Sequence, residues 1–306
     1  MNMFRGRPRK DLIMRHGALA PRALEGLNIA IIGGTNGIGR ALALAALAKG
    51  AKVKVVGRTS RDAATPSLSF VAADLSSMAA ARRVAQDLSA SSLDILVFTN
   101  GVMAGRQRRE TSEGIEYDLA VSYLSRYIIL REVASTLGVA RPTPARKPRV
   151  FLMGFPGTDQ TGSIDDFNSE RTYSLMTAHS NTVVGNEALV LDAAARYPAV
   201  NAYGLNPGLI KSNIRAAVLG DRTILQTIME AFIGLTFPSA ETYAARIAPL
   251  LVADELEDRS GVMFNSRGEA IEASRAVKDP AFVTRVINAT EELANRALGS
   301  AKAAFP

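Results

Sequence analysis

The sequence predicts an α/β fold in which one doubly wound, parallel sheet is covered by helices on both faces and forms a single domain. Short apolar runs that suit buried strands alternate with longer stretches of helix-forming residues along most of the chain. The first such run leads through a glycine-rich turn into a helix. The 306 residues, 47% of them apolar, are enough for one large core. We find no internal repeat.

Residues 1–26 differ from the rest of the chain in charge. Residues 1–24 hold six basic residues against Asp11 alone, and so carry five of the chain's seven net positive charges. An Arg-rich, acid-poor start is compatible with a mitochondrial targeting segment, but the lack of serine and the presence of Asp11 favour a solvated arm. We expect a flexible basic tail, a domain at 27–298, a tail at 299–306, and a cytoplasmic location with mitochondria as the alternative.

Composition argues against several other classes of protein. The body of the fold carries little net charge and has no groove-binding motif, which disfavours a nucleic-acid partner. No stretch approaches the roughly 18 uninterrupted apolar residues of a membrane helix, so we expect no transmembrane segment. The chain has no cysteine and only two histidines, His16 and His179, so we expect no metal site.

The turn at 33–39 is the strongest single signal. It follows the apolar run 27–32 and precedes the helix-forming stretch 40–47. Glycines allow close backbone approach, and the first amides of a helix favour an anion. In this context the pattern predicts a Rossmann-type site for a dinucleotide pyrophosphate, rather than a tight turn without a ligand. The residues expected at the site are Gly33, Thr35, Asn36, Gly37, Ile38 and Gly39.

The second strand, at 51–57, indicates which dinucleotide is bound. NAD-binding versions of this fold place an acidic residue about twenty positions after the glycines, where it binds the ribose 2′-hydroxyl. Here Arg58 and Thr59 stand at the strand end instead. A guanidinium suits a 2′-phosphate by charge and by geometry. We therefore predict NADP(H) rather than NAD(H); the alternative is that Arg58 is a solvated loop residue.

Further elements follow in the order that this fold requires. Strands are expected at 68–75, 93–101, 150–153, before 206–208, and at 260–264. Helices are expected at 77–89, capped by Asp74 or Ser76, at 114–127, from 238 with Ser239 as its cap, and at 280–298. Since nucleotides lie beyond the carboxyl ends of parallel strands, the residues that follow each strand are candidate ligands.

The spacing of Gly33, Gly37 and Gly39 resembles the short-chain dehydrogenase/reductase family, and the residues at 178–196 and 260–279 resemble its retinol-dehydrogenase-like subgroup. The resemblance covers about 27–297 and departs at Ile32, where the family has Thr. It implies that adenine is bound beside Asp74 and Leu75, that the cofactor ribose lies against Asn100 and Gly101, and that the carboxamide is held by Pro207, Gly208, Ile210 and Ser212.

The catalytic residues of that family are not retained. Its asparagine, serine, tyrosine and lysine correspond here to Ser122, Gly154 or Phe155, His179 and Val183. A second register places Tyr173 and Thr177 at the tyrosine and lysine positions. Judged by the distance to Asn206-Pro207-Gly208, that register needs extra residues inside the helix, which would rotate its buried face away from the core. We prefer the register with His179.

His179 is the predicted proton donor, because an imidazole titrates near neutrality without help from a lysine. The alternative is a histidine packed on a helix without a chemical role. Ser122 and Tyr173 are the other candidate catalytic residues, and Tyr123 is a fallback donor.

Two functions therefore stay open. The first is an NADP(H)-dependent oxidoreductase that acts on a small hydrophobic carbonyl or alcohol, since residues 213–237 are apolar and the corresponding family region covers the substrate. The second is a degenerate member that binds cofactor or ligand without redox turnover. Family members often pair through the helices at 115–134 and 178–196, so the resemblance also leaves a homodimer open.

Overall fold

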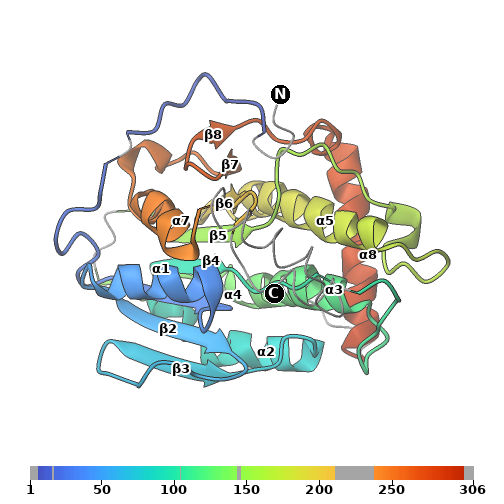
Figure 1. The fold of residues 1–306 in the computed structure, drawn as a ribbon, viewed down its shortest axis with the longest axis horizontal. Helices are drawn as coiled ribbons and strands as arrows, with labels where there is room; N and C mark the ends of the chain where they lie inside the picture. The colour runs from blue at the N-terminus through green and yellow to red at the C-terminus, as the bar shows by residue number, and fades with distance from the viewer. Residues whose placement is uncertain (1–5, 16, 104, 143–145, 211–237, 300–306) are drawn as a thin grey trace, which may run out of the picture.

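A computed structural model describes residues 6–15, 17–103, 105–142, 146–210 and 238–299. They form one sheet with strand order β3-β2-β1-β4-β5-β6-β7-β8 (Figure 1). The strands are β1 Asn28–Ile32, β2 Lys52–Gly57, β3 Leu68–Ala72, β4 Ile95–Phe98, β5 Arg149–Met153, β6 Asn201–Leu205, β7 Val262–Phe264 and β8 Ala270–Ile271. Strands β1 to β7 pair in parallel, which confirms the predicted doubly wound fold. The short β8 is antiparallel to β7, so the expectation of a wholly parallel sheet was wrong at this edge.

The helices lie on both faces of this sheet (Figure 1). They are α1 Gly37–Leu47, α2 Met78–Asp87, α3 Tyr117–Leu119, α4 Ser125–Val133, α5 Leu175–Arg196, α7 Ala240–Ile247 and α8 Pro280–Ala297. Strand β1 shows how two cores form: Ile29 and Ile31 pack with α1 and α7, whereas Ala30 and Ile32 pack with α2, α4, α5 and α8. Successive side chains of a strand point to opposite faces, so an all-apolar strand supplies both cores.

Side-chain caps define where two of these helices begin. Ser239 accepts a hydrogen bond from the amide of Thr242, as predicted for α7. The prediction for α2 was wrong, because the cap is Ser77, whose hydroxyl accepts from the amide of Ala80, and neither Asp74 nor Ser76 fills that role. Glu113, from a distant loop, accepts from the Ser77 hydroxyl at 2.8 Å. The support from Glu113 leaves no local sequence signal, because it comes from a distant loop.

The helix predicted at 114–127 is interrupted. It begins as α3, passes through a π-helical segment at Ala120–Leu124 and continues as α4. In an α-helix, positions four apart drift around the axis because a turn holds 3.6 residues, and a wider π turn offsets that drift. Asp118, Ser122 and Arg126 therefore stay on one side, facing α5. Close packing against α5 occurs at Gly185, where a Cβ would lie 2.8 Å from the Tyr123 ring.

Helix α8 packs across α5 (Figure 1). Its buried residues Val286, Ile287 and Ala294 join the same core as Tyr123 and Tyr127. The Tyr123 hydroxyl and the Thr290 hydroxyl are 2.7 Å apart and buried. Part of the surface that the sequence suggested for pairing between two copies is thus covered by the chain's own last helix.

The described part of the basic N-terminal segment lies along the edge of the sheet (Figure 1). The amide of Arg9 donates to the Ala270 carbonyl at 2.9 Å, and the amide of Glu272 donates to the Arg7 carbonyl at 2.8 Å. Pro8 forms an antiparallel bridge with Ile271. This segment therefore extends the sheet beyond β8. Among the described helices, none is both long and apolar enough to cross a bilayer.

Candidate functional site

The predicted cofactor-binding residues gather at the carboxyl ends of the central strands. Gly33 has a φ of +86°, and a Cβ there would overlap the backbone nitrogen of Asn100. A Cβ at Gly39 would overlap the hydroxyl of Thr99. These two glycines are therefore required for the turn to pack against the end of β4. Gly37 also has a positive φ, of +50°, but it faces open space, since a Cβ there would meet no atom of the described residues within 4 Å. Its open side is where a phosphate could approach.

The neighbours of these glycines complete the cradle. A Cβ at Gly57 would overlap the Thr35 hydroxyl, so Thr35 lies over the end of β2. Asn36 has an extended backbone before α1, and its side chain does not cap that helix. Ile38 is half-buried against the α1 side of the core. The first N–H groups of α1 are consequently not occupied by a side-chain cap, which fits an anionic ligand.

Arg58 and Thr59 are exposed at the end of β2. Within the described part of the chain, Arg58 forms no ion pair or hydrogen bond. The nearby Arg40 is engaged instead: its guanidinium donates to both carboxylate oxygens of Asp62, at 2.8 and 2.6 Å. This hydrogen bond lowers the pKa of Asp62. The carboxylate of Asp62 is thus paired with Arg40. Arg58, which is predicted to bind a 2′-phosphate, has no partner among the described residues.

The remaining predicted cofactor residues line the same edge. Asp74 is exposed, and one of its carboxylate oxygens accepts from the amide of Ser76 at 3.0 Å, while Leu75 is buried. The Asn100 side chain donates to the Val121 carbonyl at 2.6 Å and anchors the end of β4 to the π-helical segment. A Cβ at Gly101 would lie 3.6 Å from the Ser122 hydroxyl. Gly101 therefore places the predicted cofactor-binding residues close to the predicted catalytic residue Ser122.

The turn after β6 is compact. The Asn206 side chain accepts from the amide of Gly208 at 2.9 Å, and Gly208 has a φ of +65° that favours glycine. Pro207 and Ile210 are buried beside it. Ser212 and the predicted substrate cover at 213–237 lie outside the described residues.

His179 forms the centre of the catalytic region. It lies on α5, and its Nδ1 is 2.9 Å from a carboxylate oxygen of Asp118, which is fully buried. The other carboxylate oxygen of Asp118 accepts from the Ser122 hydroxyl at 2.5 Å. Phe155 presents a near-perpendicular ring to the imidazole, with 6.1 Å between ring centroids. The Nε2 atom has no hydrogen-bond partner among the described residues, so it is the ring nitrogen that can meet a substrate.

Asp118 is the residue that sequence reasoning missed. Ser122 was placed at the asparagine position, but the carboxylate that holds the imidazole lies four residues earlier on the same helical face. A spacing of four was the available signal, since it predicts neighbouring side chains on a helix. His179, Asp118 and Ser122 together form a chain of polar contacts that ends at the amide of Val102, which donates to the Ser122 hydroxyl at 2.9 Å.

The two tyrosines considered as alternative proton donors form hydrogen bonds with groups other than His179. Tyr173 precedes the first residue of α5 and donates its hydroxyl hydrogen to the Gly105 carbonyl at 2.7 Å. Burial, with added repulsion from Glu116 and Asp118, raises its pKa. The Tyr123 hydroxyl is fully buried against Thr290, and burial raises its pKa as well. His179 is thus the better placed of the candidate donors, although its assignment to the tyrosine position stays a prediction.

Arg126 is a second residue that the sequence did not single out. Its guanidinium is almost wholly buried and donates to the carbonyls of Met153 and Asn100, which lie at the ends of β5 and β4. It also donates to the Asn186 side chain at 2.8 Å. Burial lowers the pKa of Arg126 to about 9, and the Asp118 carboxylate opposes that shift.

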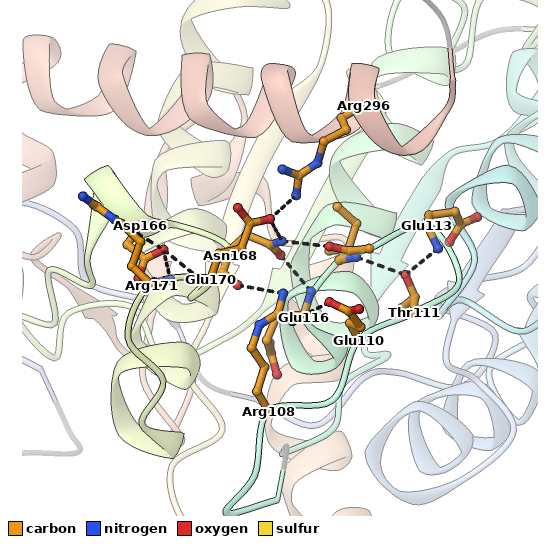
Figure 2. Close-up of polar contacts among 12 residues, drawn as sticks. Arg108, Glu110, Thr111, Glu113, Glu116, Asp166, Asn168, Glu170, Arg171 and Arg296 are labelled. Carbon is orange, nitrogen blue, oxygen red and sulfur yellow. Dashed lines mark hydrogen bonds and ion pairs between the residues drawn. The ribbon is translucent and has the colours of Figure 1, made fainter.

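A polar network holds the loops that carry these residues (Figure 2). The Asn168 side chain accepts from the amide of Glu116 at 2.8 Å and donates to the Gly114 carbonyl at 2.9 Å. The Glu116 carboxylate in turn accepts from the amide of Leu119 and so caps α3. Figure 2 also shows Glu170, which joins Asn168 to Arg296 of α8. The network fixes the start of α3, and therefore the position of Asp118, relative to the loop that leads into α5.

Comparisons with known proteins agree with the observed fold. The model for short chain dehydrogenases matches residues 27–140. A Saccharomyces cerevisiae protein, the uncharacterized oxidoreductase YKL107W, is 46% identical over 276 residues that cover 89% of each chain. A Streptomyces protein described as a daunorubicin C-13 ketoreductase is 28% identical over 65% of this chain and 71% of its own. A crystal structure of an uncharacterized Mycobacterium paratuberculosis protein has a TM-score of 0.66 at 19% identity and covers 90% of this chain and 97% of its own.

Proposed function

Because this chain belongs to the short-chain dehydrogenase family of oxidoreductases, which bind nicotinamide cofactors, we propose that it is an NADP(H)-dependent enzyme that interconverts a hydrophobic carbonyl compound and its alcohol. The observation that carries this proposal is the buried Asp118 carboxylate held on Nδ1 of His179. In our proposal this contact orients His179 as a proton donor, with His179 and Val183 at the positions predicted for the family's tyrosine and lysine. The ketoreductase name of the Streptomyces relative points to the same class of reaction.

The choice of NADP(H) rests on Arg58. Its exposed guanidinium stands at the end of β2, where the 2′ position of the adenine ribose lies in this fold. A 2′-phosphate would give it a partner of opposite charge and matching geometry. The carboxylate of Asp62, which also follows β2, is held by Arg40 and is not free to bind a 2′-hydroxyl. The glycine turn would hold the pyrophosphate, with Gly37 leaving the space that it needs.

A bound nicotinamide cofactor would supply the hydride to the carbonyl carbon, and the protein must then deliver one proton to the oxygen. Asp118 accepts a hydrogen bond from the N–H group at Nδ1 of His179. This bond fixes the ring and leaves Nε2 toward the substrate. In reduction the imidazolium gives its Nε2 proton to the developing alkoxide, and the Nδ1 hydrogen stays on the ring, hydrogen-bonded to Asp118. Ser122 donates to Asp118 and is a positioning residue. Phe155 offers an apolar wall beside the imidazole, which suits a hydrophobic substrate.

The alternative is binding without redox turnover. The observation that favours it is the loss of the family's lysine and serine, since Val183 is buried and apolar and Gly154 has no side chain. The removal of one donor to a developing oxyanion costs on the order of 3 kcal/mol in other enzymes. Both functions need the cofactor or ligand site, so the two are separated only by turnover.

The test begins with calorimetric titration of the purified protein with NADPH and, separately, NADH. We expect micromolar binding of NADPH and much weaker binding of NADH. The NADPH-loaded protein is then mixed with a panel of hydrophobic ketones and aldehydes, and loss of NADPH absorbance is followed. Binding with turnover supports the oxidoreductase. Binding without turnover on any carbonyl supports the alternative, and the absence of binding by either cofactor would overturn both cofactor-dependent functions.

A further inference from the structure

Arg126 is a buried positive charge beside the proposed catalytic histidine, without a carboxylate partner of its own. No carboxylate of the described residues lies within ion-pair distance of its guanidinium, and its three hydrogen-bond acceptors are neutral oxygens from Asn100, Met153 and Asn186. Its Nε has no partner among the described residues. A buried charge held only by dipoles is costly, because the dipoles do not fully replace the lost hydration. Such a group is therefore a candidate for a functional role.

The location of Arg126 suggests what that role is. The carbonyls that it binds end two adjacent parallel strands, β4 and β5, which is where the nicotinamide end of a dinucleotide lies in this fold. A Cβ at Gly101, which is predicted to lie against the cofactor ribose, would be 3.5 Å from one of its nitrogens. On the facing helix, the position expected to carry a lysine is the buried Val183. One cation is missing from α5, and another is supplied from α4.

Arg126 is also connected to His179 through two facing rows of side chains. Asp118, Ser122 and Arg126 form one row, and His179 and Asn186 belong to the row on α5. Asn186 accepts from Arg126, and its amide nitrogen donates to the backbone carbonyl of Ser122 at 2.9 Å. Ser122 and His179 both bind Asp118. The charge of Arg126 therefore acts on the Asp118–His179 pair from a fixed position.

We propose that Arg126 is the fixed positive charge of this site, which replaces the family's lysine from a different helix and sets the pH range in which His179 exchanges its proton. This inference rests on the proposed function, because it gives His179 the role of proton donor. Arg126 acts through His179 and is thus a positioning residue. Loss of a nearby positive charge makes an imidazolium easier to form, because like charges repel. The other charged or titratable groups around this pair are Glu116, Arg108 and Tyr173.

The chain allows a direct test because it contains only two histidines. In a His16→Ala background, the single remaining imidazole can be followed by NMR through a pH titration of the cofactor-free protein. In Arg126→Gln we expect the His179 signals to titrate about one pH unit higher than in the parent, because the opposing charge is gone. Arg126→Lys keeps the charge and should titrate within about 0.3 unit of the parent.

The matched control is Arg131→Gln. Arg131 is also buried on α4, but its guanidinium is paired with Asp192 at 2.9 Å. Its loss should leave the His179 titration unchanged. An Arg126→Gln protein that folds and titrates like the parent would overturn the proposal. So would an Arg126→Lys protein that titrates as far from the parent as the glutamine variant, and this result remains informative if the glutamine variant does not fold.

The result can be separated from failure of the proposed function. The titration uses no cofactor and no substrate, so a dependence of His179 on the charge of Arg126 is measurable even if NADPH does not bind. If NADPH binds and turnover occurs, the alkaline limb of the pH–rate profile should move in Arg126→Gln in the same direction as the NMR titration. A limb that stays in place while the NMR titration moves would also contradict the role that we assign to Arg126.

Discussion

Two regions lie at the carboxyl ends of the strands: a predicted cofactor half around the glycine turn and a predicted catalytic half around His179. The residues of the two halves differ in how closely they match the family's pattern. At the cofactor half, Gly33 and Gly39 are required because a side chain would overlap backbone or the Thr99 hydroxyl, so backbone geometry alone constrains them. At the catalytic half, the sequence predicts that Gly154, His179 and Val183 replace the family's residues. Asp118 of α3 contacts His179, and Arg126 of α4 contacts Asn186. Under our proposal, the scaffold of the binding site is retained, while α3 and α4 supply groups that act on the proton donor.

Loss of the Asp118 carboxylate should have the largest effect. Asp118→Asn keeps the shape but replaces an acceptor by a donor near Nδ1 of His179, which would hold the ring in the wrong tautomer. We expect carbonyl reduction to fall on the order of 100-fold or more, with NADPH affinity unchanged. Steady-state rates and calorimetry check this. Asp159→Asn, at an exposed carboxylate outside the site, is the control. Unchanged turnover in Asp118→Asn would contradict the role that we assign to this carboxylate in the catalytic half.

Removal of the Arg58 guanidinium should affect the cofactor half alone. Arg58→Ala is expected to weaken NADPH binding about 10- to 100-fold, because one charge-assisted contact to phosphate is lost, and to leave NADH binding unchanged. Calorimetric titration with each cofactor measures the difference. Lys52→Ala, which removes an exposed cation at the opposite end of the same strand, should change neither affinity. If Arg58→Ala weakened the binding of NADPH and of NADH equally, Arg58 would not be the residue that recognises the 2′-phosphate.

The network drawn in Figure 2 should connect stability to the catalytic half. Asn168→Ala leaves the buried amide of Glu116 and the carbonyl of Gly114 without their partner. We expect the free energy of unfolding to fall by about 1–3 kcal/mol. Urea unfolding measures the loss, and Asn288→Ala on the exposed face of α8 is the control. A variant as stable as the control would show that the network does not fix α3.

The smallest effect is expected from Tyr123→Phe. Its hydroxyl contacts only Thr290 among the described residues, so its removal should cost about 1 kcal/mol of stability and leave turnover intact. A double-mutant cycle with Thr290→Val isolates the pair, because both variants remove the same hydrogen bond. A large loss of turnover in Tyr123→Phe would instead return this tyrosine to the role of proton donor.

The parts of the structure that could be predicted from the sequence are those set by local geometry. Alternating strands and helices, the glycine turn and the Ser239 cap depend on residues within a few positions of one another. The contact of Glu113 with the Ser77 cap of α2 could not be predicted, because Glu113 reaches it from another loop. Asp118 and Arg126 were missed for the same physical reason: their roles arise from contacts with α5 and with strand ends, which lie far away along the chain.

The N-terminal segment and the C-terminal helix show the same limit. Basic residues before 27 gave a strong charge signal, yet the bridge from Pro8 to Ile271 depends on the free edge beside β8, a strand of two residues without a recognisable pattern. Helix α8 was predicted within one residue, but its position across α5 was not, because amphipathic periodicity says which face is buried and not against which partner.

The most direct measurement of the central claim is single-turnover reduction of a hydrophobic ketone by NADPH-loaded protein, compared between His179→Ala and His16→Ala. Our account predicts that His16→Ala reacts like the parent and that His179→Ala binds NADPH normally but reduces the ketone on the order of 100-fold more slowly. Equal rates in the two variants would contradict the assignment of His179 as the proton donor.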